Sequence, residues 1–158
     1  MGKTNSGIVW ISSRCVDAMR AHSQETYPEE CCGALVGLDE EVAQEVVVTP
    51  RRILEALPAA NQRTDSPRNR FSIGARDILQ AERLADARGW LVLGWYHSHP
   101  DHRARPSQYD LENAWPWYSY VIVSVRQGVA EQITSWRLLD DRQGYSSETI
   151  EIRPALRG

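Results

Sequence analysis

The chain has 158 residues and a mass of 17.9 kDa, enough for one domain with its own hydrophobic core. Its net charge of -3 and pI near 5.8 provide no basic surface of the kind that nucleic-acid-binding proteins use, so we expect no nucleic-acid partner. The longest apolar runs, such as residues 90–96, are far shorter than the roughly 20 residues that cross a bilayer. Residues 1–7 lack the apolar segment of a signal peptide, and three cysteines are too few for a disulfide framework. These features predict a cytoplasmic protein without a membrane partner.

The chain begins with a short strand-like segment and an amphipathic helix. Residues 8–11 are rich in β-forming side chains and predict a strand. Ser12 or Ser13 can then cap a helix, because a serine oxygen accepts hydrogen bonds from the first free backbone amides. Since Pro28 disfavours a helical conformation in the residue before it, we expect this helix to end near Tyr27.

Two strands and a long loop are predicted next. Residues 31–38 and 42–49 have the length and composition of strands, and the acidic turn between them indicates a hairpin that stops at Pro50. Residues 51–70 contain two prolines and many charges, so they predict a loop, which could serve as a flap facing a substrate.

The second half of the chain starts with the most regular helical pattern. Residues 74–88 place apolar side chains on one face, and Gly89 is positioned to end the helix. Residues 90–96 form an apolar run of strand length that leads directly into two histidines. Further elements are predicted as a helix at residues 107–114 and strands at residues 118–125, 132–138 and 147–152. The order β, α, β, β, α, β, α, β, β, β predicts a single α/β or α+β domain with a mixed sheet flanked by helices.

The two histidines have the spacing of a ligand pair. Alternate residues of a strand point to the same face, so His97 and His99 project together while Ser98 points away. Pro100 cannot continue a central ladder, so the chain is expected to leave the sheet where the histidines lie. A helix that begins near Ser107 would place the carboxylate of Asp110 one turn in. Three such ligands with a fourth position left open are typical of catalytic zinc, whereas structural zinc usually has four protein ligands.

Hydrolysis of an amide bond also requires a group that takes a proton from water and gives one to the leaving amine. Four carboxylates are candidates on the sequence alone, namely Asp101 and Glu112 nearby and Glu29 and Glu30 far along the chain. The spacing of residues does not choose among them.

The composite pattern resembles the JAMM (MPN-plus) metalloproteases. It consists of the run from Pro28 through Glu30 to Gly33, the sequence His97-Ser98-His99-Pro100, and an intact ten-residue interval before Asp110. The resemblance implies a JAB-type, cytidine-deaminase-like sheet in which His97, His99 and Asp110 bind Zn²⁺. It also implies that Glu30 activates the water and that Ser107 hydrogen-bonds the developing oxyanion.

The resemblance covers residues 8–152 and implies a substrate class. The family cleaves peptide or isopeptide bonds at the C-terminal tails of ubiquitin-like proteins, including prokaryotic sulfur carriers, and the tail extends along a sheet edge. The short interval between Asp110 and the strand at residues 118–125 leaves no space for the second insertion of eukaryotic deubiquitinases. We therefore expect a sulfur-carrier-like substrate in preference to polyubiquitin.

Other interpretations remain open at this stage. A non-catalytic MPN scaffold is an alternative, although such proteins usually lose metal ligands. Ser107 and Asp110 also fit a helix capping box. Trp115 and Trp117 are candidates for a substrate groove and equally for the core. Cys31 and Cys32 face opposite ways on a strand and are expected to be buried apolar side chains.

Overall fold

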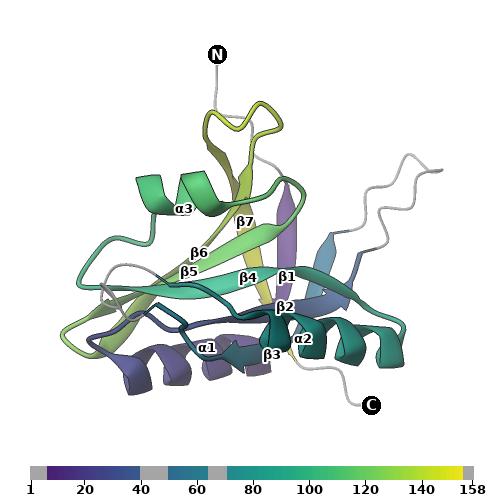
Figure 1. The fold of residues 1–158 in the computed structure, drawn as a ribbon, viewed down its shortest axis with the longest axis horizontal. Coiled ribbons are helices and arrows are strands. Elements are labelled where there is room, and N and C mark those ends of the chain that lie inside the picture. The colour runs from purple at the N-terminus through teal and green to yellow at the C-terminus, as the bar shows by residue number, and fades with distance from the viewer. Residues whose placement is uncertain (1–6, 40–49, 64–70, 155–158) are drawn as a thin grey trace.

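A strongly curved mixed sheet forms the body of the protein, with helices packed around it (Figure 1). The computed structural model describes residues 7–39, 50–63 and 71–154. In chain order its elements are β1 (Ile8–Ser12), α1 (Ser13–Thr26), β2 (Cys32–Leu38), β3 (Arg51–Ala59), α2 (Ala75–Arg88), β4 (Leu91–Pro100), α3 (Gln108–Asn113), β5 (Ser119–Arg126), β6 (Val129–Leu138) and β7 (Tyr145–Arg153). This order confirms the predicted α+β class.

The strands follow one another in the order β1-β3-β2-β4-β5-β6-β7, and β7 pairs back onto β1. β1 runs parallel to both β3 and β7, and β4 runs parallel to β5, whereas the remaining pairs are antiparallel. The predicted mixed sheet is thus confirmed. Its closure into a barrel was not anticipated, because a strand pattern does not reveal which strands meet at the edges.

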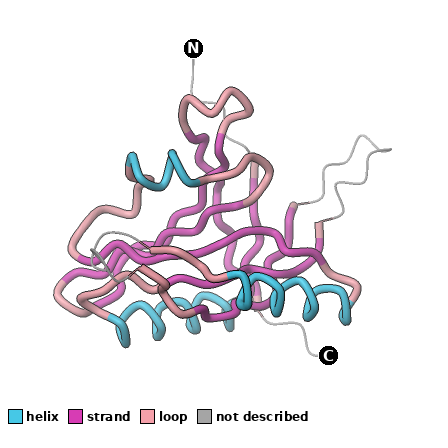
Figure 2. Tube along the Cα trace, in the orientation of Figure 1, coloured by secondary structure: helices cyan, strands magenta, loops and turns pink. Residues whose placement is uncertain are grey.

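The two longer helices, α1 and α2, pack against opposite faces of β2, and both lie along the lower side of the strands in the view of Figure 2. On β2, Leu35 joins the main core with Met19 of α1, while the neighbouring Ala34 lies beside Ala81 of α2. The same alternation applies to β4, where Tyr96 points into the core beneath α1. The next residue of β4 therefore faces away from α1. The main core comprises Val9, Ile11, Cys15, Val16, Met19, Cys31, Leu35, Ile53, Leu93, Tyr96, Val121, Val123 and Val125.

The helix ends agree with the sequence signals. Ser12 caps α1 by accepting a hydrogen bond from the backbone amide of Cys15 at 3.2 Å, and the helix ends at Thr26 with Tyr27 as its C-cap, near the predicted end. α2 ends at Gly89, whose left-handed conformation has a φ of 67°. Among the helices that the structure describes, none is both long enough and apolar enough to cross a bilayer.

The prediction of a loop across residues 51–70 was wrong for its first half. β3 occupies Arg51–Ala59 and pairs antiparallel with β2, so the hairpin partner of β2 is β3. The strand predicted at residues 42–49 lies outside the described residues. The charged residues of this segment predict an exposed loop. Arg51 is instead buried and donates hydrogen bonds to the carbonyls of Leu93 and Trp117. These acceptors come from distant segments, so a local pattern does not reveal them.

Gly94 gives a direct test of how closely β4 and β5 approach each other. A Cβ at this position would lie 1.9 Å from the carbonyl oxygen of Ser119, a backbone atom that moves only if the strands separate. We expect Gly94→Ala to lower the free energy of unfolding by about 2 kcal/mol or more, measured by urea denaturation. Gly144→Ala is the matched control, because its Cβ would meet only a Leu139 methyl at 3.8 Å. Equal unfolding midpoints for the two variants would contradict the close approach.

Candidate metal centre

The C-terminal end of β4 presents two buried imidazoles on one face of the sheet. His97 is 1% exposed and His99 is 7% exposed. Ser98 points to the other face, where its hydroxyl accepts a hydrogen bond from the backbone amide of Cys31 at 2.8 Å. β4 ends at Pro100, as the sequence predicts. The strand period and the proline thus place both histidines on one face at the C-terminal end of β4, a strand paired on both sides.

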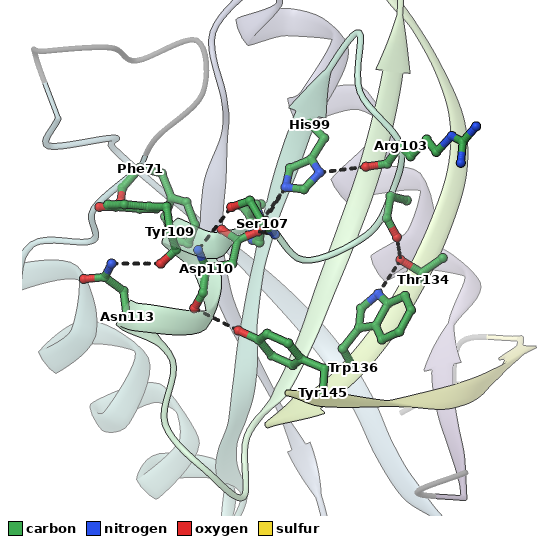
Figure 3. Close-up of polar contacts among 12 residues, drawn as sticks. Phe71, His99, Arg103, Ser107, Tyr109, Asp110, Asn113, Thr134, Trp136 and Tyr145 are labelled. Carbon is green, nitrogen blue, oxygen red and sulfur yellow. Dashed lines mark hydrogen bonds and ion pairs between the residues drawn. The ribbon is translucent and has the colours of Figure 1, made fainter. Parts of the chain in front are cut away.

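Asp110 reaches the histidines from the first turn of α3 (Figure 3). Ser107 caps this helix, since its Oγ accepts a hydrogen bond from the amide of Asp110 at 3.1 Å. In return, Oδ2 of Asp110 accepts a hydrogen bond from the amide of Ser107 at 2.8 Å. The predicted capping box is therefore present, and it fixes the carboxylate oxygen that faces the histidines.

Three electron-pair donors converge at one point. Nε2 of His97 lies 3.1 Å from Nε2 of His99, and Oδ2 of Asp110 lies 3.2 Å from each of these nitrogens. Tetrahedral zinc, with bonds of about 2.0–2.1 Å to nitrogen or oxygen, holds its ligand atoms about 3.3–3.4 Å apart. The nearly equilateral triangle therefore fits one face of a zinc coordination tetrahedron.

Contacts behind the rings orient the two imidazoles. Nδ1 of His99 donates to the carbonyl of Arg103 at 2.7 Å, which leaves the lone pair of Nε2 directed at the centre. The ring of Phe71 stacks on His97 with centroids 4.5 Å apart. Within the described residues Nδ1 of His97 has no hydrogen-bond partner, so stacking is the contact that orients this ring. Burial lowers the pKa of His97, which favours the neutral, ligating form.

Glu30 brings a second carboxylate to the same centre. It is 4% exposed, and its carboxylate lies within 4.8 Å of the ligand nitrogens of His97 and His99. Among the described residues Oε1 finds no hydrogen-bond partner. The side-chain amide of Asn61 donates to the backbone carbonyl of Glu30 at 3.3 Å and so holds the segment. This is a buried histidine-histidine-glutamate group of the kind that binds metal ions.

The two carboxylates have opposite protonation tendencies. Burial, followed by the charge of Asp110, raises the pKa of Glu30 to about 9. Burial also acts to raise the pKa of Asp110, but its electrostatic contacts and hydrogen bonds with the rings of His97 and His99 outweigh burial and hold that pKa well below its usual range. Asp110 is therefore an ionised ligand candidate, whereas Glu30 readily holds a proton, and such divergence is typical of acid-base sites.

The fold also separates Glu30 from the other three acid-base candidates. Asp101 accepts hydrogen bonds from the hydroxyl of Tyr27 and the amide of Gln127. Glu112 is exposed and bonds to Gln108, and Glu29 is exposed. The β2–β4 register pairs Cys32 with His97 and thereby brings Glu30, two residues before β2, to the centre. This pairing has no signal in the sequence.

An aromatic cleft of about 390 Å³ opens beside the centre. Trp115 lines it and is 66% exposed, so its ring is accessible to a substrate. Trp117 is not part of this lining and instead packs against the guanidinium of Arg51, 4.3 Å from its ring centroid. The full lining consists of Phe71, Ser72, Ile73, Ile78, Trp95, His97, Tyr109, Asp110, Asn113, Trp115, Tyr118 and Tyr120. The structure thus separates the two tryptophans that sequence analysis grouped together.

Cys31 and Cys32 are both buried, free thiols, as expected. Burial raises the pKa of Cys31 to about 11 and that of Cys32 to about 12, so both side chains are neutral thiols at neutral pH. Sequence reasoning missed the contacts made by Phe71, Tyr109 and Tyr145 around the centre, because their partners are backbone carbonyls or a ring from distant segments.

The chain resembles known proteins in sequence and in fold. A family model described as prokaryotic homologues of the JAB domain matches residues 12–139. The chain is 30% identical over 113 residues to the desampylase of Haloferax volcanii, covering 68% of this chain and 74% of the relative. It is 28% identical over 134 residues to the CysO-cysteine peptidase of Mycobacterium tuberculosis, covering 84% of each. A solution structure from Desulfitobacterium hafniense aligns with a TM-score of 0.79 and 29% identity over 94% of this chain and 95% of that one. The chain therefore belongs to the prokaryotic JAB-domain (JAMM) family and is a homologue of its peptidases.

Proposed function

We propose that this protein is a zinc metallopeptidase that cleaves a peptide or isopeptide bond at the C-terminal tail of a ubiquitin-like or sulfur-carrier protein. The observation that carries the proposal is the 3.1–3.2 Å triangle of ligand atoms with the buried carboxylate of Glu30 beside it. The names of two relatives, a desampylase and a CysO-cysteine peptidase, support the reaction class.

In this proposal His97, His99 and Asp110 hold the metal, and a fourth position stays open. Zinc in such a site supplies a Lewis acid and acidifies a water molecule. The chain contributes fixed ligand directions, through the carbonyl of Arg103 behind His99 and the capping box around Asp110. The donor set of two imidazoles and one carboxylate is one that zinc accepts in open catalytic sites.

Glu30 and Ser107 would act on the reacting groups. Glu30 would accept a proton from the attacking water as an ionised carboxylate and deliver it to the leaving nitrogen, and its burial, which raises its pKa, favours retention of the proton between these steps. Oγ of Ser107 accepts a hydrogen bond from the backbone amide of Asp110, so the hydroxyl hydrogen of Ser107 remains available to donate to the developing oxyanion.

The aromatic cleft is the proposed place for the substrate chain next to the scissile bond. It adjoins His97 and Asp110, and its lining is mostly apolar. An exposed ring such as Trp115 can cover an apolar side chain of an extended tail at low entropic cost, since tryptophan has only two side-chain torsions.

Metal analysis tests the ligand set. We expect about one zinc per chain in the wild type. His97→Ala and Asp110→Ala should each weaken zinc binding by more than about 100-fold, because even partners behind the ligands are typically worth 10–100-fold. His102→Ala is the control, since His102 is an exposed histidine just after the end of β4. Retention of stoichiometric zinc by His97→Ala would refute this site.

A carrier fusion tests the role of Glu30. We expect a ubiquitin-like sulfur carrier, extended by a short peptide beyond its terminal Gly-Gly, to be cut by the wild type and protected by a chelator. Glu30→Gln should reduce kcat/KM by at least about 100-fold with zinc content unchanged, because only proton transfer is removed. Glu29→Gln, which alters the exposed neighbour, should leave the rate unchanged. Zinc binding without any cleavage would favour the non-catalytic scaffold.

Substitution of Trp115 and substitution of Trp117 should have different effects, the first on KM and the second on thermal stability. Trp115→Ala removes a ring from the cleft and should raise KM for the fusion by about 10-fold with kcat little changed, as for loss of an aromatic anchor. Trp117→Ala removes the contact with Arg51 and should instead lower the melting temperature. An unchanged KM for Trp115→Ala would exclude the cleft as the substrate-binding surface.

A further inference from the structure

The helix that carries Asp110 has little apolar anchorage. α3 spans only Gln108–Asn113 and contains no buried residue. Its Leu111 is half-buried against a small cluster formed by Ala114, Tyr120 and Leu138. The capping box fixes Asp110 relative to Ser107 but does not fix the helix relative to β4, because both partners belong to the same turn. Other contacts must therefore set the distance between Asp110 and the histidines.

One such contact comes from β7, the last strand of the barrel. The hydroxyl of Tyr145 donates to the backbone carbonyl of Asp110 at 2.8 Å (Figure 3). The ring of Tyr145 packs edge-on against Tyr120 of β5, with centroids 6.3 Å apart. The hydroxyl of Tyr145 thus extends from the barrel to the helix, and it bonds directly to the residue whose side chain faces the histidines.

The second contact comes from the opposite side of the helix turn. The hydroxyl of Tyr109 donates to the backbone carbonyl of Phe71 at 2.9 Å. The ring of Phe71 stacks on His97 with an interplanar angle of 21°. Tyr109 therefore links the helix of one candidate ligand to the residue that orients another.

We propose that Tyr109 and Tyr145 are positioning residues whose hydroxyls clamp α3 against the barrel, so that Asp110 completes the ligand triangle with His97 and His99. The inference rests on the proposed metal function. Neither tyrosine is a catalytic residue, because each acts through a backbone carbonyl. The two hydrogen bonds restrain the helix from two directions, and loss of either would let Oδ2 of Asp110 drift from the distance that a tetrahedral metal requires.

Zinc affinity and cobalt spectra test the clamp. Tyr145→Phe and Tyr109→Phe keep the rings and remove only the hydroxyls. We expect each to raise the zinc dissociation constant by about 10-fold, measured by competition with a chromophoric chelator, as for other partners behind metal ligands. The visible bands of the Co²⁺-loaded variants should shift, because these bands report coordination geometry. Saturating zinc should restore kcat, since the catalytic groups are untouched.

Tyr118→Phe is the matched control. Tyr118 lines the same cleft, but its hydroxyl forms no hydrogen bond among the described residues. It should match the wild type in zinc affinity and in the cobalt spectrum. Wild-type affinity and spectrum in both Tyr145→Phe and Tyr109→Phe would overturn the clamp while leaving the metal function intact. Failure of the wild-type chain to bind zinc or cobalt would overturn both proposals.

Discussion

The convergence of three buried electron-pair donors is the constraint on which the rest of the structure depends. Nε2 of His97, Nε2 of His99 and Oδ2 of Asp110 lie 3.1–3.2 Å apart. Such an arrangement brings lone pairs together in a medium of low dielectric constant, where only a proton or a cation relieves their repulsion. A protein keeps this geometry only if its scaffold prevents the donors from separating. The barrel and the segments around it hold the three donors together.

Support for the donors comes from segments far apart in the sequence. The close approach of β4 to β5 at Gly94 keeps the histidine strand in the middle of the sheet. Arg51 ties β3 to carbonyls of β4 and of the segment before β5, which secures the other end of the same strands. Around the site, the carbonyl of Arg103 and the ring of Phe71 orient the imidazoles. Together these contacts hold the histidine strand and orient its two imidazoles.

The surroundings of Asp110 and Glu30 give these two carboxyl groups opposite pKa shifts. Asp110 and Glu30 carry the same functional group, yet contact with the imidazoles lowers the pKa of Asp110, while burial raises that of Glu30. One is thereby suited to ligate a cation and the other to carry a proton, and peptide hydrolysis needs both. The aromatic cleft beside them adds a surface for an apolar segment of a substrate chain. The proposed reaction follows from this combination more than from any single residue.

The sequence by itself determined what depends on neighbours along the chain. The strand period placed His97 and His99 on one face, and the capping box placed Asp110 one turn into α3, because both are local geometries. Tertiary structure decided the rest. It turned Arg51–Ala59 into a strand, separated Trp115 from Trp117, and through the β2–β4 register placed Glu30 beside the histidines, one of four carboxylates that the residues alone left equal. These outcomes depend on which distant backbone groups meet, and hydrogen bonds to backbone carbonyls leave no trace in the identity of the residues that accept them.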